Sequence, residues 1–211
     1  MIHELRTYTL IPGTLVRYIA VFEDAWKRIR GDRYGKLEGY WSTESGTLNQ
    51  VVHLWSFTDL AERQRLRAEL MKNEAWTGEY LPKSREMLLS QENKILAPVL
   101  PLAPPHESGN IYELRTYRTL PGRTREWLDR FVAVTPVREK YSKRVGLWQT
   151  EIAQLNEVTH LWVYRDVAER AAVRSTLSRD PDFQQFLREA TPLLAHMQSI
   201  ILSPASFSPM K

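Results

Sequence analysis

The chain has 211 residues, of which 43% are hydrophobic and 26% are charged, and its formal net charge is +4. These proportions exclude a disordered chain, and no apolar run approaches the roughly 20 residues that span a bilayer. Cysteine is absent, which excludes disulfides, thiolate metal sites and thiol nucleophiles. Basic and acidic residues are interspersed, which is typical of solvated helix faces rather than of a nucleic-acid-binding surface. We therefore expect a cytoplasmic protein with no membrane span and no nucleic-acid partner.

The first half of the chain predicts strands and amphipathic helices in alternation. β-branched and aromatic residues indicate the strands, and apolar residues spaced three and four apart indicate the helices. The predicted elements are a strand at 2–10, a helix from 14 to near 31, strands at 38–44 and 48–57, a helix after Asp59, a short helical turn after Pro82 and a strand near 94–96. The order β-α-β-β-α-β is typical of a ferredoxin-like fold.

The second half repeats the first. Residues 2–8 return as residues 111–117 with one difference, His3 against Tyr112. Further blocks recur 107 positions later, including the segment Asn-x-x-x-His-Leu-Trp at 49–55 and 156–162. Shared blocks with small drifts between them indicate a duplicated unit with loop insertions and deletions.

The repeat predicts three regions along the chain. The first ferredoxin-like repeat covers 1–97 and the second covers 110–211, and a Pro-rich linker at 98–109 joins them. Four prolines between 97 and 105 lack amide donors and fix φ, which favours an extended, semi-rigid connection. The fold class predicted is α+β, with two βαββαβ repeats forming an α+β barrel within one chain.

Strand alternation predicts which residues share a face of each sheet. Leu5, Val52 and Leu54 form an aliphatic layer, which we expect to face the helices. The opposite face then carries a mixed polar and aromatic set in each copy, and two such faces packed together would enclose a cavity inside the barrel. The set comprises Glu4, Arg6, Tyr8, His53 and Trp55 in the first copy, and Glu113, Arg115, Tyr117, His160 and Trp162 in the second.

The repeated blocks resemble those of the NIPSNAP family. The strand Glu-Leu-Arg-Thr-Tyr, the Pro-Gly that follows it, the Gly-x-Trp at 39–41 and 146–148, and the His-Leu-Trp strand carry the resemblance, which covers both halves. His3 departs from the aromatic residue at Tyr112. The resemblance implies a dimeric α+β barrel with both half-barrels in one chain. Members of the family are associated with vesicle traffic and mitochondrial quality control, so the resemblance also implies a scaffold role.

The charged residues of the mixed face admit two interpretations. Glu4 with Arg6, and Glu113 with Arg115, either form structural ion pairs or bind a carboxylate or enolate oxygen through the arginine fork. In the second case the glutamate orients the arginine or moves a proton.

The aromatic residues of this face also admit structural and functional interpretations. His53 and His160 are either core histidines, general bases or axial haem ligands. Neither has a second ligand three or four positions away, so no metal site is predicted. Trp55 and Trp162 are either core residues or pocket walls, and Tyr8 and Tyr117 can donate to a ligand oxygen.

Two functions remain open from the sequence. One is a barrel that binds a small, partly apolar anionic or carbonyl ligand, with cofactor-independent oxygenase or isomerase chemistry by analogy of fold. Its catalytic candidates are His53, His160, Glu4 and Glu113, and its ligand-binding candidates are Arg6, Tyr8, Trp55, Arg115, Tyr117 and Trp162. No cofactor is predicted, and haem is the weaker alternative. The other function is a non-catalytic interaction protein or scaffold. A homo-oligomer through helix or outer-sheet surfaces is compatible with both.

Overall fold

The computed structural model describes residues 1–211. The chain divides into two compact units. The first comprises Met1–Ala97 together with Leu202–Lys211, and the second comprises Pro98–Ile201. The last ten residues of the second repeat therefore group with the first unit, although the sequence places them in the second repeat.

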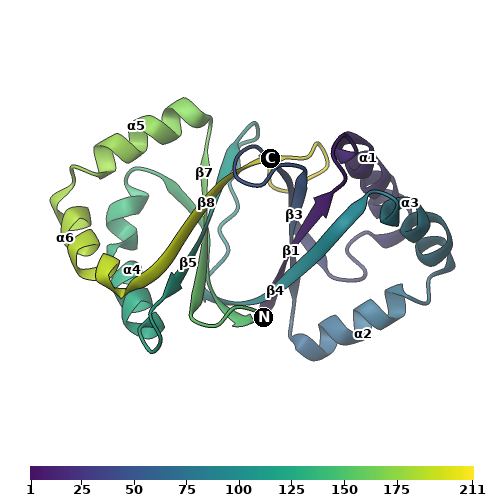
Figure 1. Ribbon diagram of the computed structural model, residues 1–211, viewed down its shortest axis with the longest axis horizontal. Coiled ribbons are helices and arrows are strands. Elements are labelled where there is room, and N and C mark those ends of the chain that lie inside the picture. Colours follow the sequence, from purple (N-terminus) through teal and green to yellow (C-terminus); the bar gives the residue numbers. More distant parts are fainter. The chain divides into compact units, whose positions relative to one another are not determined.

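The first unit is a four-stranded antiparallel sheet with all its helices on one face (Figure 1). Its strand order is β4-β1-β3-β2, and the end of β8 pairs with β2. The elements are β1 (Ile2–Leu10), α1 (Leu15–Ala25), the π-helical turn η1 (Trp26–Arg30), β2 (Lys36–Thr43), β3 (Gln50–Phe57), α2 (Leu60–Leu70), the π-helical turn η2 (Trp76–Tyr80), α3 (Leu81–Arg85) and β4 (Leu88–Leu100).

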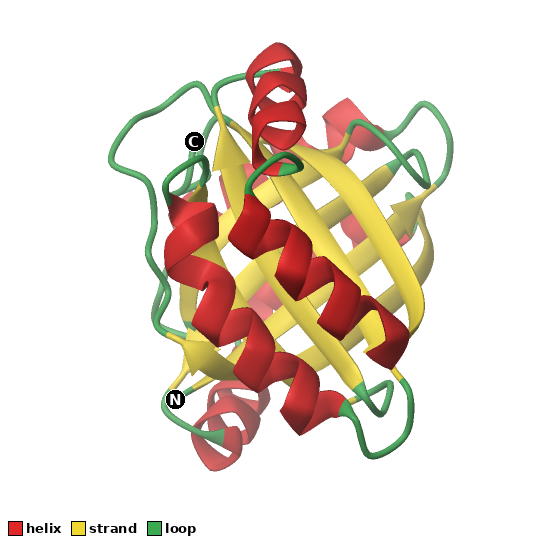
Figure 2. Cartoon of the chain, turned by 90° about the vertical axis from the view of Figure 1, so that its left-hand side faces the viewer, coloured by secondary structure: helices red, strands yellow, loops and turns green.

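The second unit repeats this plan, and its helices lie across the strands (Figure 2). Its strand order is β8-β5-β7-β6. The elements are β5 (Ile111–Thr119), α4 (Thr124–Glu139), β6 (Lys143–Ile152), β7 (Glu157–Tyr164), α5 (Val167–Leu177), α6 (Pro181–Ala190), the 3₁₀ turn η3 (Thr191–Leu193) and β8 (Leu194–Pro204). None of the helices has both the length and the apolar character needed to cross a membrane.

The fold class predicted from the sequence is confirmed. Hydrogen bonds join the eight strands in the closed order β1-β3-β2-β8-β5-β7-β6-β4. The sequence admits Thr58 or Asp59 as the cap of the second helix of the first repeat, and Asp59 is the cap, because its carboxylate accepts from the backbone N–H of Glu62. Asp166 does the same for Glu169 in the second repeat. Each glutamate in turn accepts from the backbone N–H of the residue before the cap, an arrangement that resembles a capping box.

The last strand of the first repeat is longer than the sequence predicts. β4 runs from Leu88 to Leu100 rather than from 94 to 96, so its last three residues enter the segment predicted as a linker. Pro98 lies inside this strand. A proline is tolerated at strand positions where no ladder hydrogen bond needs its missing N–H, and composition alone does not reveal such a position.

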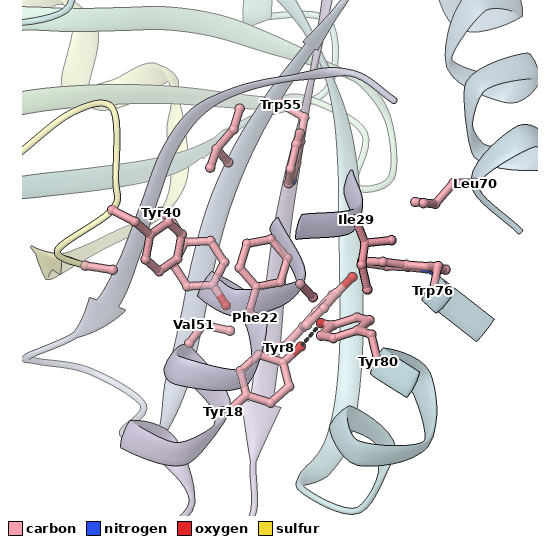
Figure 3. Close-up of a cluster of buried hydrophobic side chains, with 14 of the residues drawn as sticks. Tyr8, Tyr18, Phe22, Ile29, Tyr40, Val51, Trp55, Leu70, Trp76 and Tyr80 are labelled. Carbon is pink, nitrogen blue, oxygen red and sulfur yellow. Dashed lines mark hydrogen bonds between the residues drawn. The ribbon is translucent and has the colours of Figure 1, made fainter. Parts of the chain in front are cut away.

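The faces of the sheets are the reverse of the prediction. Tyr8 and Trp55 pack with Tyr18, Phe22 and Ile29 of the helices in one buried cluster (Figure 3). The second unit does the same with Tyr117 and Trp162 against Trp127 and Phe131. The mixed polar and aromatic set therefore faces the helices, and the aliphatic residues lie on the other face. The prediction was wrong because β3 and β7 are buried on both faces, so alternation does not show which face the helices cover.

The Gly-x-Trp segments are explained by packing. A Cβ at Gly39 would lie 2.0 Å from the Trp41 ring, and a Cβ at Gly146 would lie 2.0 Å from the Trp148 ring. Each tryptophan ring lies directly over the glycine backbone, next to a register shift in the strand pairing. This motif is therefore structural.

Candidate functional site

Each unit contains a cavity between its sheet and its helices. In the first unit the cavity measures about 240 Å³. Arg6 and Tyr8 of β1 and His53 of β3 form its floor, and side chains from α1, η1, α2, η2, α3 and β4 form its walls. These wall residues include Tyr18, Phe22, Arg30, Arg67, Leu70, Trp76, Tyr80, Ser84, Arg85 and Gln91.

The second unit has a cavity of about 190 Å³ at the equivalent place. Its lining repeats that of the first at Arg115, Tyr117, Phe131, Arg138, Arg174 and Leu177, and adds apolar side chains from α6 and β8. Both copies have a cavity at the same position, with arginines at matching positions. The cavity is therefore a feature of the repeated unit.

A buried glutamate lies next to each cavity. Glu113 accepts hydrogen bonds from Arg115, Arg170 and Ser199, each at 2.6 Å. Burial alone would raise the pKa of Glu113, but the two arginines and the serine lower it to about 2. Glu113 is therefore a carboxylate at neutral pH, too weakly basic to abstract a proton.

The first unit repeats this glutamate site with looser bonds. Glu4 accepts from Arg63 and Asn93, whereas Arg6 Nη1 lies 3.5 Å from the Glu4 carboxylate. Burial opposes ionisation of Glu4, and Arg6 and Arg63 hold its pKa below the ordinary value. Arg6 Nε has no hydrogen-bond partner. The first-unit arginine thus keeps donor capacity that its counterpart, Arg115, has used.

Both buried histidines are held in one tautomer by a tryptophan. Trp55 Nε1 lies 2.6 Å from His53 Nδ1, and Trp162 Nε1 lies 2.6 Å from His160 Nδ1. Because an indole N–H can only donate, Nδ1 must carry the lone pair and Nε2 must carry the proton. Burial, reinforced by nearby arginines, lowers the pKa of both histidines well below 6.5. Each is therefore a neutral N–H donor through Nε2.

Two buried arginines stack on the same tryptophans. The guanidinium carbon of Arg30 lies 3.5 Å from the centre of the Trp55 ring, and that of Arg138 lies 3.5 Å from the centre of the Trp162 ring. These arginines are 4% and 5% exposed. Burial lowers the pKa of Arg30 to about 9 and that of Arg138 to about 10. Neither pairs with a carboxylate, and the Nε of each lacks a partner.

The predicted site residues separate into four positions. Arg6, Tyr8, His53, Arg115 and Tyr117 line the cavities. Trp55 and Trp162 lie behind the histidines, fully buried and outside the cavity lining. Glu4 and Glu113 anchor the arginines, and His160 lies 4.8 Å from the Phe131 ring, measured between ring centres.

The sequence also missed contributors to the cavities. Arg30 was assigned to the end of a helix, and Arg67 belongs to a run of charges interpreted as a solvated face. One signal could have identified Arg67: it recurs as Arg174 at the 107-residue spacing of the repeat. A charged residue repeated in both copies is less easily explained as a solvated one.

The cavity groups favour one kind of chemistry. Guanidiniums, a neutral imidazole N–H and phenols are all donors, and the cavity linings contain no carboxylate. Such a set binds an anion or stabilises negative charge that develops on a carbonyl oxygen.

Comparison with known proteins places the chain in a family. The NIPSNAP family model matches residues 3–101 and 112–209. The human protein NipSnap homolog 3A is 34% identical over 215 residues, covering 99% of this chain and 85% of that protein. A solved structure from Fusobacterium nucleatum, named for a proposed monooxygenase activity, matches with a TM-score of 0.70 at 12% identity and covers 96% of this chain and 91% of that one.

An anthrone oxidase-like protein of known structure matches with a TM-score of 0.68 at 10% identity, covering 100% of this chain and 94% of that one. At these identities the two solved structures show the shared fold alone. The family match and the human relative rest on sequence over nearly the whole chain. This chain belongs to the NIPSNAP family.

Proposed function

We propose that each unit binds a small, partly apolar anionic or carbonyl ligand in the cavity between its sheet and its helices. One observation carries the proposal: Arg30 and Arg138 are buried, line the cavities and have no carboxylate partner. An uncompensated buried charge costs several kcal/mol. Stacking on tryptophan offsets only about 2 kcal/mol of this cost, so an anion in the cavity is the natural counter-charge.

The cavity size limits the ligand. Volumes of about 240 and 190 Å³ fall below the roughly 300 Å³ at which pockets for drug-sized molecules begin. Aromatic side chains form much of each wall, which favours a flat or apolar body attached to the anionic group. A small aromatic or short-chain carboxylate, or a carbonyl compound that ionises to an enolate, meets both conditions.

The donor set supports stabilisation of an enolate as the chemical step. His53 is a neutral N–H donor beside Arg6 and Arg30, and the three would favour negative charge on a ligand oxygen. Two solved structures with this fold are named for a proposed monooxygenase and an anthrone oxidase-like protein, which supports cofactor-independent oxygenase or isomerase chemistry. Glu4 and Glu113 do not supply the base, because arginines hold their pKa values low. The substrate would have to ionise readily.

We propose further that no haem is bound. Nδ1 of each buried histidine accepts from a tryptophan, so Nε2 carries a proton and has no free lone pair for iron. A cavity of about 240 Å³ also lacks room for a porphyrin. Titration with haem should produce no shift of the Soret band, and a shift that His53→Ala removes would contradict this assignment.

The test replaces the buried charges without removing their bulk. Phenylacetate is titrated calorimetrically into the wild-type protein, Arg30→Met, Arg138→Met and the double variant. Arg125→Met is the control, because the Arg125 side chain is 87% exposed. Each single variant should lose one site, and the double variant should lose affinity at least tenfold. Removing an uncompensated buried charge should leave folding stability unchanged or raise it by about 1–4 kcal/mol.

The opposite pattern would refute ligand binding. If wild-type protein bound no phenylacetate at millimolar concentration, or if the double variant bound it unchanged, the cavities would not be anion sites. A loss of stability in both single variants, with no change in binding, would assign the arginines to the core. That result would favour the alternative function of a non-catalytic interaction protein, which needs no open cavity.

A further inference from the structure

The two cavities share three arginine positions but differ in one wall. Tyr18 of the first unit is Trp127 in the second, at the spacing of the repeat. Tyr80 is replaced by Phe186, since Tyr80 packs edge-on against Phe22 at 6.0 Å and Phe186 packs edge-on against Phe131 at 5.9 Å, both between ring centres.

A third position on this wall follows the same trend. Gln91 in β4 corresponds to Met197 in β8, and each lines its own cavity. Phe183 and Leu187 extend the apolar wall of the second unit. The first-unit wall therefore offers two phenols and an amide where the second-unit wall offers an indole, a phenyl ring and a thioether.

The first-unit phenols keep hydrogen-bonding capacity for a ligand. The hydroxyls of Tyr18 and Tyr80 lie 3.4 Å apart in the buried wall (Figure 3). Burial raises the pKa of Tyr80 to about 12 and holds that of Tyr18 well above its ordinary value, so both phenols are protonated at neutral pH. Their mutual contact uses one of two protons, and each oxygen can also accept. At the spacing that relates Tyr80 to Phe186, Ser84 of the first-unit lining is replaced by Ala190 in the second.

A second difference points the same way. Arg115 Nε donates to the Tyr117 hydroxyl at 2.5 Å, which uses this arginine donor and one lone pair of the phenol oxygen. In the first unit Arg6 Nε has no partner, so this donor of Arg6 is available to a ligand. The first cavity thus has one more unpaired arginine donor at its floor and more hydroxyl and amide groups in its wall, where the second unit has a single unpaired donor, Trp127 Nε1.

We infer that the two cavities select different anions. The first unit takes an anion with a second polar group, such as a hydroxylated aromatic carboxylate, and the second takes an anion with a hydrocarbon group in that place. This inference rests on the proposed function. A site with buried hydrogen-bonding groups rejects a ligand that leaves them unpaired, whereas an apolar wall discriminates less strongly against an added hydroxyl.

The test uses two probes of matched shape, 4-hydroxyphenylacetate and 4-methylphenylacetate. Arg138→Met isolates the first-unit site and Arg30→Met isolates the second, and calorimetry measures both probes with each variant. The first-unit site should prefer the hydroxyl probe at least tenfold, and the second should prefer the methyl probe about threefold. Adding Tyr80→Phe to Arg138→Met should abolish the first preference, and adding Phe186→Tyr to Arg30→Met should reverse the second.

The outcomes separate this inference from the proposed function. If neither probe binds the wild-type protein, the proposed function fails and the inference with it. If both probes bind but the two isolated sites show the same preference, or if the exchanges at Tyr80 and Phe186 change nothing, the inference is wrong and anion binding stands. Circular dichroism of each variant verifies that a lost preference is not a lost fold.

Discussion

The tautomer of the buried histidines provides a sharp test of the site geometry. In Trp162→Phe, the indole N–H that donates to His160 Nδ1 is lost, and a buried acceptor is left without a partner. That loss costs about 1–3 kcal/mol, and a weaker aromatic face for Arg138 adds about 0.5–1 kcal/mol. The matched control is Trp127→Phe, because Trp127 is equally buried and its N–H has no hydrogen-bond partner. Both variants remove the same atoms.

Urea unfolding should therefore show Trp162→Phe less stable than Trp127→Phe by about 2 kcal/mol. Because both truncations leave the same empty volume in the core, this difference measures the cost of the lost hydrogen-bond donor. Nitrogen-15 spectra of wild-type protein should show His53 and His160 protonated at Nε2 alone. No titration of either should occur between roughly pH 5 and 8, where an ordinary histidine changes charge. Equal stability of the two variants, a proton on Nδ1, or a titration near pH 6.5 would refute the reasoning.

Three further outcomes follow from packing and charge. Gly39→Ala should destabilise the fold by about 1–3 kcal/mol in urea, because the new Cβ meets Trp41; the control Gly78→Ala, with open space around its Cβ, should not. The folded-state pKa of Glu113 is about 2 against an ordinary 4.5, so the stability it contributes is complete above pH 4.5 and is lost as the pH falls through 2. Acid melts of Glu113→Gln should lack this loss, and a wild-type-like acid transition would contradict it. Removing residues 205–211 should lower the thermal midpoint of the first unit by several degrees, and an unchanged midpoint would show that this segment does not complete the core.

The elements could be predicted because local signals agree with the fold. The duplicated strand, the cap at Asp59 and the spacing of apolar residues each indicate the structure that forms. The faces of the sheets could not be predicted, because both faces are buried and neither Leu5 nor Tyr8 marks a solvent side. A single choice between two buried faces decided where the cavity was expected, and that choice was wrong.

The site could be predicted only in its strand residues. Arg6, Tyr8 and His53 stand out as polar groups in strands, where a mixed face is unusual. Arg30 and Arg67 lie in helical segments rich in charge, where an arginine that reaches inward looks like one that reaches outward. The long aliphatic stem makes this possible, since a guanidinium can lie far from its own backbone. Repetition in the second copy separates Arg67 from Arg65, although Arg63 recurs in the same way as Arg170.

The two copies keep the features that cost stability and vary those that do not. A buried arginine without a counter-ion and a histidine forced to stay neutral both work against folding, yet both units retain them around Trp55 and Trp162. Tyr18 and Trp127, by contrast, are alternative ways to fill a wall, and either satisfies the packing. Proteins tolerate destabilising arrangements where activity or binding requires them. Under the proposed function, the buried arginine and histidine are the part of each unit that ligand binding constrains, and the aromatic wall is the part that sets which ligand binds.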